Sequence, residues 1–130
     1  MGEIGESPEQ EPENREPVLP RVEARPRNWL EPVVLVLLRE WTSYGYELMV
    51  RLTELGFEAT NPGTLYRTLR RLERNGLCES EWETSEGGPA RRRYYITEEG
   101  QAYLDLWAEA LEQYQRTMNA FFRLYTGRQQ

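Results

Sequence analysis

The sequence predicts a mainly α-helical fold that carries one small β-hairpin, and three observations lead to this class. Residues 61–76 follow a helical pattern with leucine on one side and arginine on the other. Two short stretches of alternating polarity, 77–84 and 91–97, then flank a glycine-rich loop. Apolar residues recur with heptad spacing from 104 to 125. In this order, the elements predict a winged helix-turn-helix followed by a long C-terminal dimerisation helix.

The composition restricts the classes of function that the chain can serve. It has 130 residues, a net charge of −6 and a sequence pI near 4.9, with no histidine and one cysteine. Histidine-based catalysis, Ser-His-Asp and Cys-His nucleophiles and most zinc sites are therefore excluded, so we expect no enzyme, no cofactor and no metal. Without a long apolar run or a signal-peptide pattern, the chain is expected to be cytoplasmic and to avoid membranes.

Charge is unevenly distributed along the chain. Residues 1–27 contain five prolines and a run of glutamates, and they predict a disordered, acidic, proline-rich leader. Either an inert solvated leader or a tail that screens a DNA-binding face fits this composition. Every basic residue is arginine, and positive charge concentrates in 67–74 and 91–93. A local positive field can attract DNA although the net charge is negative.

The next unit spans residues 28–97 and is expected to begin with two helices. Residues 28–42 are apolar nearly all round, with Asn28 as a candidate cap. A partner subunit is therefore expected to cover part of this helix, at the aligned positions Trp29, Val33, Leu37 and Trp41. After a break at 43–45, residues 46–55 form a second helix that ends at Gly56 and turns inward Leu48, Leu52 and Leu55.

The third helix, residues 61–76, has two opposed faces. Asn61 is a good N-cap and Pro62 suits the first helical position. The buried stripe is expected to contain Leu65, Leu69 and Leu72. An ordinary solvated face usually mixes charges of both signs, whereas the outer face here is largely basic and suits the DNA major groove. We expect base contacts from Thr64, Arg67 and Arg71, phosphate contacts from Arg70 and Arg74, and supporting roles for Asn61 and Gly63.

Two strands, 77–84 and 91–97, form the predicted wing around the loop 85–90. Cys78 in the first strand is expected to be a small buried hydrophobe. At the base of the wing, a phosphate backbone or a minor groove is expected to meet Arg91, Arg92 and Arg93. These arginines can also pair across the strands with Glu79, Glu81 and Glu83, and both arrangements can coexist.

The last unit, residues 98–126, is expected to be one helix that begins after Thr97 and stops at Gly127. Its heptad seam is formed by Leu104, Trp107, Leu111, Tyr114, Met118, Phe121 and Tyr125. So long a seam favours packing on a second chain, although folding back on its own core is the alternative. The aromatic seam also suggests a cleft for a small aromatic or hydrophobic effector at Trp107 and Tyr114, with simple aromatic packing as the competing explanation.

Two functions account for this pattern. One is a dimeric, sequence-specific DNA-binding transcriptional regulator that binds a pseudo-palindromic duplex operator. The other is a non-enzymatic protein-interaction module that dimerises through its C-terminal helix. The interaction module would not need an arginine face followed by a basic hairpin, so the residues favour the regulator.

Four motifs resemble the PadR family of transcriptional regulators. They are Tyr44-Gly45-Tyr46-Glu47-Leu48, Gly63-Thr64-Leu65-Tyr66, Leu69-x-x-Leu72-Glu73-x-x-Gly76-Leu77 and Tyr94-x-Ile96-Thr97-x-x-Gly100. The resemblance covers residues 28–125, and the single C-terminal helix is similar to the short PadR subfamily. The phrases NPGTLYRTLRRLE and GPARRRYYIT further resemble the branch of polyhydroxybutyrate-responsive repressors.

The resemblance implies a winged helix-turn-helix homodimer that represses a promoter and is relieved by a small ligand between paired C-terminal helices. It also implies that Tyr46, Thr64 and Tyr66 help to hold the DNA backbone. Two positions depart from the family pattern. Arg67 stands where many members have proline, and Arg93 stands where many have an aromatic residue, so the operator is expected to differ from those of other members.

Overall fold

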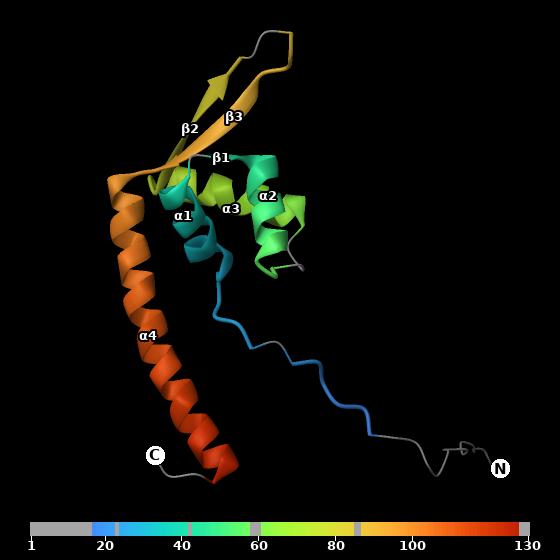
Figure 1. The fold of residues 1–130 in the computed structure, drawn as a ribbon, viewed down its shortest axis with the longest axis vertical. Coiled ribbons are helices and arrows are strands. Elements are labelled where there is room, and N and C mark those ends of the chain that lie inside the picture. The colour runs from blue at the N-terminus through green and yellow to red at the C-terminus, as the bar shows by residue number, and fades with distance from the viewer. Residues whose placement is uncertain (1–16, 23, 42, 58–60, 85–86, 128–130) are drawn as a thin grey trace, which may run out of the picture.

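The structure, a computed structural model, describes residues 17–22, 24–41, 43–57, 61–84 and 87–127. Its elements in chain order are α1 (Leu30–Glu40), β1 (Ser43–Tyr44), α2 (Gly45–Glu54), α3 (Pro62–Arg74), β2 (Cys78–Glu83), β3 (Arg91–Ile96) and α4 (Glu98–Thr126). The first three helices gather in one body, from which the β2–β3 hairpin and α4 project in opposite directions (Figure 1). This is the predicted winged helix-turn-helix with a long C-terminal helix. Disorder was predicted for residues 1–27, of which residues 1–16 and 23 lie outside the described residues.

Helix α1 begins with a backbone turn and without a side-chain cap. We predicted Asn28 as the cap, but Trp29 takes that position and Asn28 has a φ of 59°. The Asn28 carbonyl accepts the Glu31 N–H at 3.0 Å, which closes the turn that starts the helix. Asparagine tolerates this left-handed conformation better than most residues, because its short polar side chain bonds locally.

Helix α2 follows directly on β1, a strand that the sequence analysis did not predict. The Tyr44 N–H donates to Glu47 Oε1 at 3.2 Å in a capping box, so the helix begins at Gly45. Leu48 and Leu52 are fully buried as predicted. Leu55 is 60% exposed, contrary to our prediction, because it lies beyond the last turn of α2.

Helix α3 lies within the predicted residues 61–76 and has the predicted N-cap and the predicted buried side. Asn61 Oδ1 accepts the Thr64 N–H at 2.8 Å, and Pro62 occupies the first position, where no N–H is needed. Leu65, Leu69 and Leu72 have no exposed surface. They pack toward α1, α2 and β2 and thereby fix the opposite side of α3 on the outside of the body.

The three strands form one antiparallel sheet in the order β1-β3-β2. In the hairpin, Glu81 lies opposite Arg93 and Glu83 lies opposite Arg91. Strand β1 pairs with the other edge of β3, where Tyr44 lies opposite Arg93. The short strand therefore joins the start of α2 to the middle of β3.

Helix α4 extends over 29 residues, which is about 43 Å at 1.5 Å per residue. The Thr97 hydroxyl accepts the Gly100 N–H at 2.9 Å and donates to the Gly76 carbonyl at 2.7 Å. A Cβ at Gly100 would lie 2.0 Å from the Leu77 carbonyl oxygen, so only glycine allows this close approach. Gly127, with a φ of 75°, ends the helix as predicted.

The core surrounds α1 and corrects one part of the predicted dimer interface. Val33 and Leu37, which we assigned to that interface, are only 6% and 5% exposed within the single chain. They are covered because α3, α4 and β3 of the same chain all pack against α1. Trp29 is half-buried beside Phe57, with ring centroids 6.2 Å apart, whereas Trp41 remains 45% exposed.

Candidate nucleic-acid interface

The outer face of α3 exposes three of the four predicted arginines. Arg67, Arg70 and Arg74 are all exposed along this face. Arg67 Nη2 donates to Thr64 Oγ1 at 3.2 Å, so these two side chains lie together on the N-terminal half of the helix. Because guanidinium groups bind phosphates and guanine edges, this face has the chemistry to contact a duplex.

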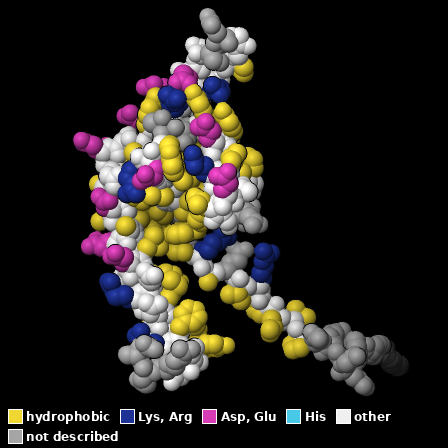
Figure 2. All heavy atoms as spheres, viewed as in Figure 1, with side chains coloured by type: hydrophobic (Ala, Val, Ile, Leu, Met, Phe, Trp, Pro, Cys, Tyr) yellow, Lys and Arg dark blue, Asp and Glu magenta, His cyan; other side chains and the backbone are white. Residues whose placement is uncertain are grey.

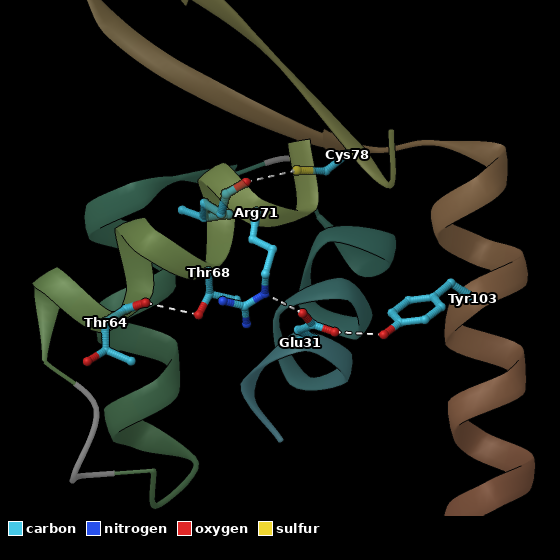
Figure 3. Close-up of polar contacts among 7 residues, drawn as sticks. Glu31, Thr64, Thr68, Arg71, Cys78 and Tyr103 are labelled. Carbon is cyan, nitrogen blue, oxygen red and sulfur yellow. Dashed lines mark hydrogen bonds and ion pairs between the residues drawn. The ribbon is translucent and has the colours of Figure 1, made fainter. Parts of the chain in front are cut away.

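The Arg71 side chain points from α3 toward Glu31 of α1 (Figure 3). Its Nε donates to Glu31 Oε2 at 2.7 Å, and the Glu31 side chain is 6% exposed. Tyr103 of α4 donates its hydroxyl to the other oxygen of the same carboxylate at 2.7 Å. Arg71 therefore has an internal ion-pair partner, which the sequence analysis did not expect of a base-contacting residue.

The three wing arginines, which we predicted at the base of the wing, lie in the half of β3 next to the loop, and they differ in their partners. Arg93 Nη1 lies 3.1 Å from Glu83 Oε2. Arg92 Nε donates to Ser80 Oγ at 2.8 Å, and its Nη2 lies 3.7 Å from a carboxylate oxygen of Glu73. Cross-strand pairing with glutamate, one of our two alternatives, thus holds for Arg93, while Arg92 reaches a glutamate of α3.

Arg91 contacts two tyrosines. Its Nη1 donates to the Tyr46 hydroxyl at 3.1 Å, and its guanidinium carbon lies 4.3 Å from the centroid of the Tyr44 ring. The Tyr44 and Tyr46 rings are stacked, with centroids 5.9 Å apart. The Tyr44 hydroxyl donates to Glu83, and this hydrogen bond raises the pKa of Tyr44, so the phenol stays protonated at neutral pH. The wing and the start of α2 are therefore joined by an ordered layer of arginine on tyrosine.

A cleft of about 680 Å³ separates the outer face of α3 from the sheet. It is lined mostly by aromatic rings and guanidinium groups, contributed by Tyr44, Gly45, Tyr46, Tyr66, Arg70, Glu73, Arg74, Trp82, Arg91, Arg92 and Tyr94. Gly45 lets the Tyr66 ring lie close to the start of α2, because a Cβ at Gly45 would lie 2.3 Å from the Tyr66 hydroxyl oxygen and would require the ring to move. The cleft brings the predicted residues Tyr46, Tyr66 and Arg70 to the wing arginines, so helix and wing form one basic surface.

Sequence reasoning missed several residues of this cleft. Tyr44, Trp82 and Tyr94 were not assigned to the interface, although they line it. The available signal was the pairing of the two strands, because a hairpin that places Trp82 opposite Arg92 brings both side chains to the same face of the sheet. A second hollow of about 500 Å³ lies beside the N-terminal half of α3, where Thr64 and Arg67 meet Trp29 and Phe57.

The apolar seam of α4 becomes more exposed with distance from the body. Leu104 is 6% exposed and Trp107 and Leu111 are half-buried, whereas Tyr114, Met118, Phe121 and Tyr125 are 41%, 38%, 56% and 77% exposed. Hydrophobic side chains lie on the free part of this helix in Figure 2. The second half of α4 therefore does not fold back on the core of its own chain. None of the helices in the described ranges is both long and apolar enough to cross a membrane.

Known proteins resemble this chain in sequence and in structure. The transcriptional regulator Rv3488 of Mycobacterium tuberculosis is 42% identical over 73 residues, which make up 56% of this chain and 66% of that protein. A PadR-like transcriptional regulator from Bacillus cereus has a crystal structure with a TM-score of 0.66 and 30% identity, matched over 72% of this chain and 91% of that one. The crystal structure of a PadR family regulator from Clostridium difficile matches with a TM-score of 0.67 and 28% identity. The match covers 73% of this chain and 99% of that one.

The family assignment rests on the part of the chain that builds the interface. The model of the transcriptional regulator PadR-like family matches residues 34–106, from α1 through the wing to the first turns of α4. This match covers more than half of the chain and includes α3, the cleft and the wing arginines. The chain therefore belongs to the PadR-like family of transcriptional regulators, which are DNA-binding proteins.

Proposed function

We propose that the protein is a homodimeric, sequence-specific repressor that occupies a pseudo-palindromic operator. The observation that carries this proposal is α3, whose leucine side is fully buried while Arg67, Arg70 and Arg74 are exposed beside a basic cleft. Two such helices enter successive major grooves about 34 Å apart when a dimer binds.

The residues of the interface divide into base-contacting and phosphate-contacting groups. Thr64 and Arg67 lie on the N-terminal half of α3, which enters the groove deepest, so they contact base edges. Phosphates of the flanking backbone are bound by Arg70, Arg74, Arg91 and Arg92, with Tyr46 and Tyr66 forming the wall of the cleft. Arg71 is left out of both groups, because it is paired with buried Glu31.

The second half of α4 supplies the dimer contact. Its exposed seam, including Tyr114, Met118 and Phe121, is apolar and matches the heptad spacing of helices that pack in pairs. Phe121 stacks on Tyr125 with centroids 6.0 Å apart, which prearranges an aromatic surface. A second copy that covers this seam also sets the distance between two α3 helices.

A small aromatic or hydrophobic effector relieves repression by binding between the paired helices near Trp107 and Tyr114. These residues lie two helical turns apart, where the seam passes from half-buried to exposed. Titration of a panel of small aromatic compounds, followed by tryptophan fluorescence, tests this role. A fluorescence change that Trp107→Phe abolishes supports it, and an unchanged spectrum across the panel argues against it.

Selection of bound duplexes from a randomised DNA pool, followed by salt titration of the enriched pool, tests the proposed function. A two-fold motif with half-sites about one turn apart is expected, together with a steep loss of affinity as salt rises. A stable dimer that enriches no sequence would instead favour a protein-interaction module and would overturn the proposal.

A further inference from the structure

Glu31 is a buried carboxylate whose two oxygens bind two different helices. One oxygen accepts from Arg71 Nε of α3 and the other accepts from the Tyr103 hydroxyl of α4, both at 2.7 Å (Figure 3). The residue is only 5% exposed, although it is ionisable. A buried charge is costly unless it is paired and hydrogen-bonded. Glu31 meets both conditions, because Arg71 supplies a positive charge and both partners donate directional hydrogen bonds.

This carboxylate lies between the two helices to which the proposed function gives different tasks, DNA contact for α3 and dimer contact for α4. α1 packs against both α3 and α4, so Glu31 in its first turn is placed between them. Much of the remaining contact of α1 with its neighbours is apolar, through residues such as Val33, Leu37 and Leu104. Apolar contacts tolerate small sliding movements, whereas hydrogen bonds to a carboxylate restrict both distance and direction.

This set of hydrogen bonds ends close to the proposed effector position. The Tyr103 hydroxyl donates to Glu31, which raises the pKa of Tyr103, and Trp107 lies about one helical turn further along α4. Arg71 of α3 is therefore connected through Glu31 to Tyr103, one turn from Trp107. These side chains come from α1, α3 and α4 and form one continuous set.

We propose that Glu31 is a positioning residue that fixes the angle between α3 and α4, and thereby the half-site spacing that the dimer accepts. This inference rests on the proposed function, in which α4 pairs with a second copy and α3 enters the major groove. Adding one base pair between half-sites moves them apart by about 3.4 Å and rotates them by about 34°. A protein with a fixed angle rejects that operator, whereas one with a looser angle accepts it.

The test compares wild type, Tyr103→Phe and Glu31→Gln on the selected operator and on versions lengthened or shortened by one base pair. Tyr103→Phe removes one hydroxyl and keeps the ring, and Glu31→Gln removes the charge and keeps the shape. We expect wild type to lose about tenfold or more in affinity with either altered spacing. Both variants are expected to lose about threefold or less, while their affinity for a single half-site stays at the wild-type level.

The matched control is Tyr95→Phe, which removes a hydroxyl bonded to Glu81 Oε1 at 3.0 Å in the hairpin. It is expected to keep the spacing selectivity of wild type. A purely structural role for Glu31 would lower affinity for every spacing by the same factor, and that result would overturn the inference. Unchanged selectivity in Tyr103→Phe and Glu31→Gln would overturn it as well. If wild type itself binds no duplex, the proposed function fails first and the inference fails with it.

Discussion

Arginine side chains that look alike in the sequence have different surroundings in the structure. Arg67 is exposed and donates to its neighbour Thr64, whereas Arg71 binds a buried carboxylate. On a helical wheel Arg71 lies at the edge of the arginine face, with Thr68 between it and the leucine stripe. The wheel does not show that Glu31 of α1 lies within hydrogen-bond reach of this position.

Arg67→Ala is expected to weaken specific operator binding by about 1–3 kcal/mol, because one guanidinium contact to a base edge is lost. The measurement is a fluorescence-anisotropy titration with the selected operator and with an unrelated duplex. Arg116→Ala on α4 is the control, since it removes the same charge from an exposed position outside the interface. Wild-type affinity in Arg67→Ala would show that Arg67 does not contact a base.

Arg71→Ala is expected to lower the free energy of unfolding by about 2 kcal/mol, because Glu31 keeps its buried charge and loses its cationic partner. Urea denaturation monitored by circular dichroism measures this change. Arg67→Ala, which leaves no buried charge behind, should unfold like wild type. An equally stable Arg71→Ala protein would mean that water or another side chain replaces the guanidinium.

Cys78 is expected to make stability depend on alkaline pH. Burial raises the pKa of its thiol to about 12, and the Cys78 side chain packs against the Leu69 carbonyl of α3. In the unfolded chain the thiol ionises near pH 9, so the unfolded state binds fewer protons than the native state above that pH. The stability contribution is thus complete below pH 9 and falls as pH rises toward 12.

Urea titrations at pH 8, 9 and 10 measure this effect against Cys78→Ala. Wild type is expected to lose up to about 1.4 kcal/mol between pH 9 and 10, and the variant should lose less over the same interval. Tyrosines with raised pKa values act in the same direction, because they ionise near pH 10 in the unfolded chain, but they do so in both proteins, so the difference between wild type and variant isolates the thiol. Equal slopes for the two proteins would contradict the assignment.

At the scale of single elements, local sequence signals determined most of the fold. Helix α3 was predictable because its cap, its proline and its leucine stripe all agree, and α4 was predictable from Thr97, Gly127 and the heptads. Strand β1 was not, since two residues are too short to show a period. Val33 and Leu37 were assigned to a partner subunit, but they are buried within their own chain. Apolar residues on every side of a helix do not reveal which chain covers them.

Gly100→Ala is expected to destabilise the protein by about 2 kcal/mol or more, because the added methyl would overlap the Leu77 carbonyl. Gly100 lies in the first turn of α4, and Leu77 is held between α3 and β2 by backbone hydrogen bonds with Leu72 and Thr97, so neither can move aside without cost. Thermal denaturation of this variant is compared with Gln101→Ala, whose side chain is half-buried one position away. An unchanged melting temperature would mean that α4 can be displaced from the α3–β2 connection.

For the whole molecule, Phe121→Glu is expected to dissociate the proposed dimer, because the charge would be buried in the paired seam. Analytical ultracentrifugation should show monomer where wild type sediments as dimer, with the same helical content by circular dichroism. Gln115→Glu, which adds a charge to an exposed position of α4 outside the seam, is the control. A dimeric Phe121→Glu protein would place the interface elsewhere.

Helix α4 is attached to the body at one end only, so it has the geometry of a lever arm (Figure 1). Over its length of about 43 Å, a displacement of about 4 Å at the far tip corresponds to a rotation of only about 5° at the Thr97–Gly100 end. Movements imposed at the tip therefore reach the body much reduced. Conversely, a slight rotation of the body about the start of α4 moves the far end of the helix by several ångströms.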